Sequence, residues 1–319
     1  MFRRALSLLL FSLPLVALTP PALAAASRTP SIVWHPLTRA GSTIYSYTAV
    51  VREGQSLFTA VRFPYATTAF HLHDGSQDPP AATPLYPDAG PMVSPAEYRV
   101  GLVAVFNGGF KVAAHAGGTL IDGRILSPLV PGMATAVITV AGHLTIGVWG
   151  HGLPSPRVHA IAYRQNLPLL VADGRPTPAA AEYFNWGGVV SSWPQPRSAL
   201  GVTATGDVVY VATAAPVLPE TVAAALVAAG VVTGMQLDIN PAWPSLGVAQ
   251  PVKHAAAPGF ALALPGEQRN PYVYLTGSDR DFFDVLARPT TPGCTLRYPG
   301  FAHGSPAPQP PILVGRCRA

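Results

Sequence analysis

The sequence has few charged residues. They occupy 11% of its 319 positions, and Lys111 and Lys253 are the only lysines among 20 basic side chains. The arginines are scattered rather than clustered, whereas a surface that follows a phosphate backbone needs a basic patch. We therefore expect no nucleic-acid partner.

Several catalytic signatures are also absent. The sequence contains no P-loop, no Gly-x-Ser-x-Gly nucleophile elbow and no His-Glu-x-x-His zinc motif. These absences exclude most templates for hydrolases and nucleotide-binding proteins. Any catalytic site must be found from individual polar residues at the ends of apolar strands.

Long apolar runs are missing after the first residues. Residues 1–24 contain Arg3 and Arg4, an apolar stretch and Ala22-Leu23-Ala24, a pattern typical of a cleaved signal peptide. No later run reaches the roughly eighteen apolar residues that a transmembrane helix needs. We predict a chain without a transmembrane segment that is exported to the cell envelope or the medium. The sequence does not distinguish Sec from Tat export.

Cysteine is scarce as well. Cys294 and Cys317 are the only two, and an exported chain with an even number of cysteines favours one disulfide. This bond would pin the proline-rich tail, residues 291–319. A metal site in the tail would need more ligands than His303 offers.

The 30 glycines and 36 prolines predict many short elements joined by turns. We expect an α+β fold, with strand-rich mixed sheets and a few covering helices in one compact domain. An N-terminal β-meander and loop (25–99) would precede a core (100–290). The elements expected are strands at 43–51, 56–63, 100–106, 198–204, 208–213, 231–238, 260–264 and 272–276, hairpins turning at 122–123, 141–142 and 173–174, and helices starting at 95, 219 and 280.

His71, His73 and Asp74 lie on or just after one predicted strand, and the two histidines share a face. Two interpretations stay open: a metal site, or the edge of a half-exposed strand. We favour the strand edge and predict no metal site and no cofactor, although a divalent metal remains open. The oligomeric state is not indicated by the sequence.

Asp238 is the acid that ends a strongly apolar strand, Val231–Leu237, where burial can tune its pKa. Asp238 and Asn240 before Pro241 also fit an ordinary turn. Arg197 leads a strand that precedes the intervening helix, so it could approach Asp238 and bind a phosphate, or form a structural pair. Asp173 fits a turn and a site equally well.

Four motifs in order resemble the phosphodiester glycosidase family. They are Val105-Phe106-Asn107-Gly108-Gly109-Phe110, Pro168 to Gly174, Arg197 to Val202 with Gly206-Asp207, and Met235-Gln236-Leu237-Asp238. The resemblance covers about 100–264. It implies an active site lined by Asn107, Gly108, Gly109, Arg197 and Asp238. We also predict Phe110, Lys111, Asp173 and Asn240 as substrate contacts.

The sequence departs from this family after Asp238. The family's Leu-Asp-Gly-Gly-Gly-Ser is replaced by Leu237-Asp238-Ile239-Asn240-Pro241-Ala242, which is similar to exported actinobacterial proteins with Leu-Asp-Ile-Asn. Bulky residues stand where glycines would admit the substrate, so either the substrate differs or activity is lost.

Two functions follow from the resemblance. The first is an exported hydrolase of a sugar phosphodiester or related envelope glycan, with Asp238 as the catalytic carboxylate, Arg197 holding the phosphate, and Asn107 with the Gly108 and Gly109 amides near the sugar. The alternative is a glycan-binding envelope protein without activity, in which tryptophans such as Trp186 and Trp243 stack on sugars.

Overall fold

The chain is built mainly from β-strands, with several sheets and few helices, so the predicted strand-rich sheets are confirmed and the α+β class is corrected to a mostly β fold. The computed structural model describes residues 32–79, 92–155, 157–182, 186, 194–250, 259–298, 300–301, 308–309 and 311–317. The predicted signal peptide, residues 1–24, lies outside these ranges. Every ladder between the described strands is antiparallel except the short β9 and β10 pair, so the sheets are less mixed than expected.

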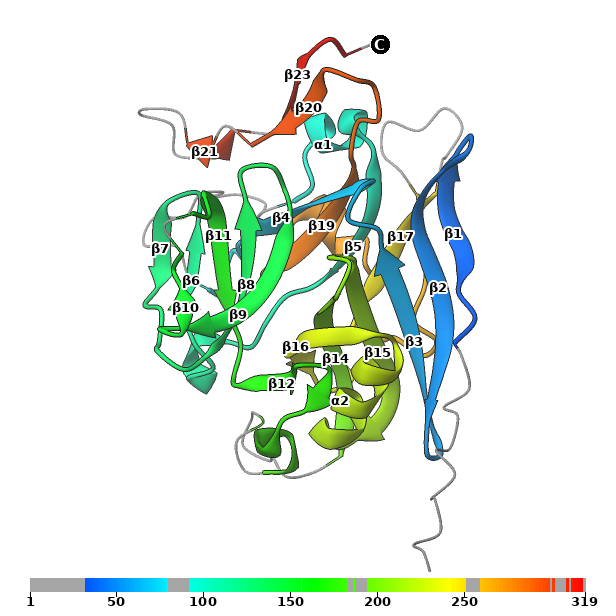
Figure 1. Ribbon diagram of the computed structural model, residues 1–319, viewed down its shortest axis with the longest axis vertical. Helices are drawn as coiled ribbons and strands as arrows, with labels where there is room; N and C mark the ends of the chain where they lie inside the picture. Colours follow the sequence, from blue (N-terminus) through cyan, green and yellow to red (C-terminus); the bar gives the residue numbers. More distant parts are fainter. Residues whose placement is uncertain are drawn as a thin grey trace, which may run out of the picture. The chain divides into compact units, whose positions relative to one another are not determined.

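The largest sheet has eight strands in the order β1-β2-β3-β15-β14-β16-β12-β13. Helix α2 lies against this sheet and contacts β12 to β16 and β2 (Figure 1). The strands are β1 (His35–Ala40), β2 (Thr43–Glu53), β3 (Ser56–Phe63), β12 (Leu169–Ala172), β13 (Arg175–Pro176), β14 (Gln195–Thr203), β15 (Val208–Val217) and β16 (Val231–Ile239).

Two further sheets complete the framework. The six-stranded sheet has the order β10-β9-β8-β11-β6-β7, and the five-stranded sheet β18-β17-β5-β19-β4. Their strands are β4 (Thr68–His73), β5 (Leu102–Asn107), β6 (Thr119–Ile121), β7 (Arg124–Ser127), β8 (Ala134–Thr139), β9 (Leu144–Trp149), β10 (Gly152–Leu153), β11 (Ala160–Gln165), β17 (Leu246–Gln250), β18 (Gly259–Leu262) and β19 (Phe282–Ala287).

The remaining elements are short. The helices are α1 (Pro95–Val100), α2 (Pro219–Ala228) and α3 (Val273–Thr276), with 3-10 turns η1 (Val112–Ala114) and η2 (Pro178–Ala181). Two small ladders join β20 (Cys294–Arg297) to β23 (Ile312–Gly315) and β21 (Gly300–Phe301) to β22 (Pro308–Gln309). No helix in the described ranges has the length and apolar character to span a bilayer.

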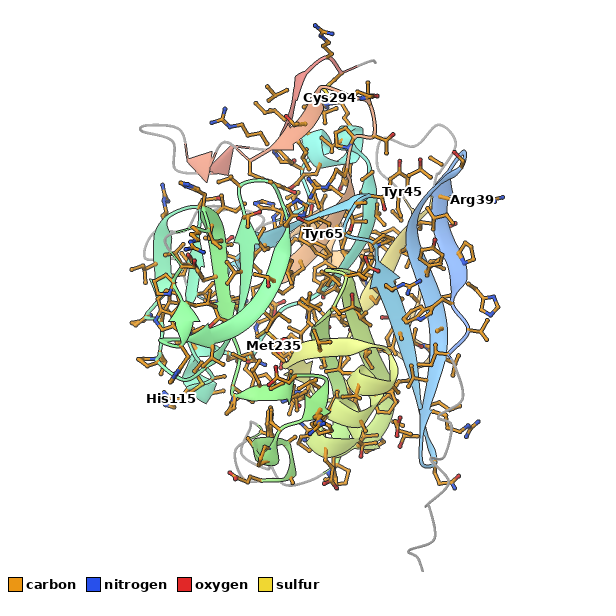
Figure 2. The ribbon with its side chains drawn as sticks, in the orientation of Figure 1. Arg39, Tyr45, Tyr65, His115, Met235 and Cys294 are labelled. Atoms are coloured by element: carbon orange, nitrogen blue, oxygen red, sulfur yellow. A yellow bond between two sulfur atoms is a disulfide. The ribbon has the colours of Figure 1, made fainter. Side chains whose placement is uncertain are left out.

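The three large sheets share one hydrophobic core. Phe63, Leu72, Phe106, Met235 and Phe283 are among its buried members, and Figure 2 labels Met235 on β16. A second cluster lies between the eight-stranded sheet and α2 and includes Trp186, which is fully buried. Trp186 therefore packs in the interior and is no platform for a sugar.

Local signals predict many of the elements correctly. Ser94 and Glu97 form the predicted capping box at the start of α1. The hairpins turn at Asp122-Gly123 and Asp173-Gly174, where both aspartates have positive φ. Helix α2 ends before Gly230, whose φ of +89° suits glycine. The predicted disulfide between Cys294 and Cys317 is present and joins β20 to the end of the chain.

Two predictions between 272 and 287 are wrong. Val273–Thr276 is a helical turn rather than a strand. An Asx turn precedes it, in which the Tyr272 amide donates to Asn270 Oδ1. Phe282–Ala287 is the strand β19 rather than a helix. Its aromatic and branched side chains insert it between β4 and β5, and this long-range pairing overrides the local Ser278-Asp279 cap signal.

The histidines of β4 differ from the half-exposed strand edge that we expected. β4 is indeed the edge of its sheet, but His71 and His73 are only 4% and 7% exposed. Glu97 from α1 contacts both rings, and Tyr298 stacks on His71. Helix α1 and the C-terminal segment therefore cover this edge.

Candidate functional site

Asp238 lies near the end of β16, where the eight-stranded sheet meets the five-stranded sheet. Its amide donates to Gly108 O at 3.0 Å, and its Oδ1 accepts from the Ile239 amide at 2.9 Å. Its Oδ2 lies 2.9 Å from Arg280 Nη2. The carboxylate is 10% exposed, so a partly accessible acid faces one arginine.

Burial sets the protonation of this acid. Desolvation raises the pKa of Asp238 to about 7, and the Asp281 charge acts in the same direction. Arg280, the Ile239 amide and Arg164 oppose this rise without cancelling it. A carboxyl group with a pKa near 7 exchanges protons readily at neutral pH, which is the property of a general acid or base.

Arg280 is the arginine that reaches Asp238. Its Nη2 also donates to Gly109 O at 2.8 Å, and the Trp243 ring lies over its guanidinium at 4.6 Å. Within the described residues, its buried Nε makes no hydrogen bond. Arg280 therefore has an unused donor beside Asp238, which an anionic group could take.

A second acid beside Asp238 is fully engaged. Asp281 Oδ2 accepts from Arg164 Nε at 2.7 Å and from the Gly109 amide at 3.1 Å, while Oδ1 accepts from Arg164 Nη2 at 3.2 Å. Arg164 also donates to Phe110 O and Gln165 O. This buried pair holds the loop after β5 and leaves Asp281 little capacity for a substrate.

The two glycines after Asn107 are needed for this pair to fit. A Cβ on Gly108 would lie 2.0 Å from Asp281 Oδ2, and one on Gly109 would lie 2.7 Å from Arg164 Cζ. Both amides already donate to Asp281, to its backbone oxygen and its Oδ2 respectively. Substrate oxygens could use these amides only if those bonds broke.

Asn107 uses every hydrogen-bonding position of its side chain. Its Nδ2 donates to Gly108 O and Ser198 Oγ, and its Oδ1 accepts from the Tyr210 hydroxyl and the Ser245 amide. An asparagine amide offers two donors and two acceptor positions, so none is left for a sugar. Asn107 joins β5 to β14 and β15 beneath the site.

Arg197 contacts Val217, Gln236 and Trp186. Its Nε donates to Val217 O at 2.9 Å, and its Nη1 donates to Gln236 Oε1 at 2.7 Å and Trp186 O at 3.5 Å. Burial lowers the pKa of Arg197 to about 10. These three contacts are with neutral oxygens, and the described ion pair of Asp238 is with Arg280.

The other predicted substrate contacts divide into near and distant residues. Phe110 is buried, and its carbonyl oxygen accepts a hydrogen bond from Arg164. Asn240 Oδ1 closes a turn by accepting from the Ala242 amide. Lys111 lies 5.7 Å from the Trp243 ring, which also stacks on Arg269 at 4.9 Å. Asp173 is exposed at the β12 to β13 turn, where the next residue, Gly174, bonds to Val232 O. Val232 is six residues before Asp238 on β16, so the turn lies about 20 Å from Asp238.

Three important residues, Arg164, Arg280 and Asp281, were missed in the sequence. Arg280 and Asp281 stand directly before the mostly apolar strand Phe282–Ala287, which could have marked them as polar residues at a strand end. Arg164 lies within an alternating strand and gives no such signal. Asp281 pairs with it across a separation of 117 residues.

Among the described residues, the acids at this site face arginines, an arrangement that competes with metal binding. The group with suitable spacing for a metal lies elsewhere and consists of His71, His73, Glu97 and Asp284. A surface pocket lined by Pro196, Pro241, Pro244 and Glu267 borders the Asn240–Trp243 turn without including Asp238 or Arg280.

Comparison with known proteins finds a similarity to one family over part of the chain. The sequence profile described as phosphodiester glycosidase matches residues 100–238, a segment that includes Asn107, Arg164 and Asp238. The resemblance to the phosphodiester glycosidases is confirmed. It supports a glycosidase-type function in general. No curated protein matches the chain.

Solved structures of low sequence identity are also similar. A zebrafish N-acetylglucosamine-1-phosphodiester alpha-N-acetylglucosaminidase catalytic domain, auto-inhibited by its pro-peptide, is 11% identical with a TM-score of 0.48, over 82% of this chain and 85% of that one. A hypothetical protein from Synechocystis is 14% identical with a TM-score of 0.44, over 76% and 62%. A putative exported protein from Burkholderia pseudomallei is 12% identical with a TM-score of 0.42, over 78% and 76%.

Proposed function

We propose that this phosphodiester glycosidase relative is an exported enzyme that hydrolyses a glycosyl phosphodiester, with Asp238 as its catalytic carboxylate. The observation that carries the proposal is the ion pair between Asp238 and Arg280, 2.9 Å apart at the end of a buried strand. A nucleophile or base and a cation for the departing phosphate are thereby adjacent.

The chemistry needs only one carboxylate. A phosphate monoester is a weakly basic leaving group, so it requires charge stabilisation more than a proton when the bond to the anomeric carbon breaks. Asp238 then either attacks that carbon or removes a proton from the attacking water. Asp281 is not a second catalytic carboxylate in this proposal, because Arg164 and Gly109 occupy its oxygens.

The phosphate contact is assigned to Arg280 in preference to Arg197. Arg280 adjoins Asp238 and has an unbonded Nε, whereas the described contacts of Arg197 are with neutral oxygens near α2. The test compares Arg280→Lys with Arg197→Lys. Arg280→Lys should raise KM or lower kcat in a protein of normal stability, whereas Arg197→Lys should mainly lower the unfolding temperature. The reverse result would assign the phosphate contact to Arg197.

Asp238→Asn tests the catalytic role. We expect the loss of about three orders of magnitude in kcat/KM, as for removal of a general base or nucleophile. The assay uses an N-acetylglucosamine-1-phosphodiester probe together with other glycosyl phosphodiesters, with the products identified by mass spectrometry. Asp173→Asn is the matched control and should stay within about twofold of wild type, because an exposed turn residue contributes little. Equal activity in wild type and Asp238→Asn would exclude the mechanism.

A second function is favoured by one feature. Trp243 is half-buried and covers Arg280 and Arg269, in the turn that replaces the family's glycines. A glycan-binding protein without activity would use this ring to stack on a sugar. Trp243→Ala separates the two functions: an enzyme would keep or gain hydrolysis because Arg280 is uncovered, whereas a binding protein would form no product and would lose glycan affinity.

Export through residues 1–24 is part of the proposal. Its support is the Cys294 and Cys317 disulfide, a bond that persists in oxidising compartments. N-terminal sequencing of the protein recovered from the envelope or the medium should show a chain that starts after Ala24. A chain that retains Met1 and stays inside the cell would contradict export.

A further inference from the structure

A second polar cluster lies on the face of the five-stranded sheet opposite the hydrophobic core. His71 and His73 come from β4, Asp284 from β19 and Glu97 from α1. Asp284 pairs directly with His71 across the ladder, so these side chains share one face. All four residues are between 0% and 7% exposed. This cluster is separate from Asp238 and has no role in the proposed hydrolysis.

The four side chains direct their polar atoms toward a common point. Glu97 Oε1 lies 3.1 Å from His71 Nδ1 and 3.3 Å from His73 Nε2, and His73 Nε2 lies 3.7 Å from Asp284 Oδ2. One ligand atom from each residue falls within 4.8 Å of all the others. Ligands about 2.05 Å from a tetrahedral ion are about 3.3 Å apart, close to the three contacts of 3.1, 3.3 and 3.7 Å.

His71 Nδ1 and Glu97 Oε1 share a hydrogen bond of 3.1 Å, whereas the inner atoms of His73 and Asp284 make none with the described residues. In the described part of the chain, His73 Nε2 and both carboxylate oxygens of Asp284 are buried and make no hydrogen bond. Glu97 differs, because its Oε2 accepts from the Ser94 amide in the capping box while Oε1 faces the histidines. The cap thus fixes the carboxylate and presents one oxygen, as supporting contacts do at metal sites.

The charges of the cluster call for a cation. Two buried carboxylates face two imidazoles, and no lysine or arginine contacts the carboxylates among the described ion pairs. A bound cation would compensate this buried negative charge.

We propose that His71, His73, Glu97 and Asp284 form a binding site for one divalent transition-metal ion, with Zn²⁺ as the best match. Two imidazoles and two carboxylates suit Zn²⁺, whereas Ca²⁺ and Mg²⁺ prefer oxygen ligands alone. A doubly charged ion neutralises both carboxylates with the histidines uncharged. Four protein ligands fill a tetrahedral shell, so the site is structural rather than catalytic.

The ion would join three elements that are distant in sequence. It would fasten the edge strand β4 to β19 and to α1, at the point where Phe282 stacks on His73 at 4.4 Å. The chain after His73 continues to Asp78, whose backbone pairs with Asp279 and Asp281. Metal binding would therefore also steady the segment that carries Arg280.

Metal content of the full-length protein tests the proposal directly. The protein is purified with a tag that contains no histidine run, stripped with a chelator, and dialysed against Zn²⁺, Co²⁺ or Mn²⁺. Elemental analysis should find about one Zn²⁺ per chain, and Zn²⁺ should raise the unfolding temperature of the stripped protein by about 5 °C. Co²⁺ should give the strong visible absorption of a tetrahedral centre.

His73→Gln and Asp284→Asn should each lower Zn²⁺ affinity at least tenfold. His143→Gln is the matched control, because His143 is a partly buried histidine that stacks on Tyr65 outside the cluster. It should bind one ion as the wild type does. If the cluster variants fail to fold, the Co²⁺ spectrum of the wild type decides the question. Binding below one tenth of an equivalent, or equal binding by the cluster variants and wild type, would show a buried ion network closed by protons.

Discussion

The two buried charge clusters of this protein differ in the origin of their positive charge. At the Asp238 site, the cations are Arg164 and Arg280, whose guanidinium groups are always charged. In the His71 cluster, the described cationic partners of Glu97 and Asp284 are imidazoles, which lose their charge when they lose a proton. Permanent cations compensate the carboxylates of the Asp238 site, whereas uncharged imidazoles leave the charge of Glu97 and Asp284 to be compensated by the proposed metal ion.

The same difference determines what each carboxylate contributes to stability. Asp281 accepts three hydrogen bonds from Arg164 and Gly109, so its charge is well compensated. Asp284 accepts none from the described residues although it is fully buried. A buried carboxylate with permanently charged donors stabilises the fold, whereas one without such donors can bind an added cation.

The largest effect on stability should come from Asp281→Asn. This change leaves the Arg164 guanidinium buried without its charged partner, a loss of about 3–5 kcal/mol in the free energy of unfolding. Asp284→Asn, in the protein stripped of metal, should change it by less than about 1 kcal/mol because few bonds are lost. Denaturant unfolding of both variants in the presence of a chelator measures the contrast. Similar losses in the two variants would remove the distinction between the clusters.

A smaller effect is expected from Gly109→Ala. The added Cβ meets the Arg164 guanidinium at 2.7 Å and must push apart the pair with Asp281. Overpacking of this kind costs about 1–3 kcal/mol. The loss should be smaller when Arg164 is already replaced by methionine, and a double-mutant cycle measured by thermal unfolding reports that coupling. Additive effects would show that the glycine is needed for another reason.

The finest comparison concerns the pH dependence of hydrolysis. Because Asp238 must be ionised to act as a base or nucleophile and its pKa is raised to about 7, kcat/KM should increase as the pH rises through 7. Arg280 lowers that pKa, so Arg280→Gln should move the midpoint upward by about one unit. A profile that falls as pH rises through 7 would make Asp238 a general acid instead.

Local sequence signals account for much of this fold. The Ser94 and Glu97 capping box, the Asp-Gly turns and the helix before Val231 depend on neighbours within a few residues, and these predictions are confirmed. β19 was taken for a helix because its identity as a strand depends on β4 and β5, which are more than 170 residues away.

The candidate site shows the same limit. Asp238 stands out because an acid ends an apolar strand, which is a local pattern. Its partner Arg280 and the Arg164 pair with Asp281 arise from contacts between remote strands, so no spacing rule reveals them. Arg197 lies on the strand next to β16 and pairs with Ile239, beside Asp238. The order of the strands does not reveal the direction of its guanidinium group. The structure directs it toward Trp186 and Gln236.

The hydrogen bonds of Asn107 have a consequence for recognising active relatives from their sequences. This amide connects strands of two sheets, and the glycines after it make room for the Arg164 pair. A descendant that lost its enzymatic activity would still need Asn-Gly-Gly in order to fold, so natural selection would keep the motif in active and inactive proteins alike. Under the proposed function, classification of relatives by activity would therefore use the positions of Asp238 and Arg280, which the proposal assigns to the chemistry.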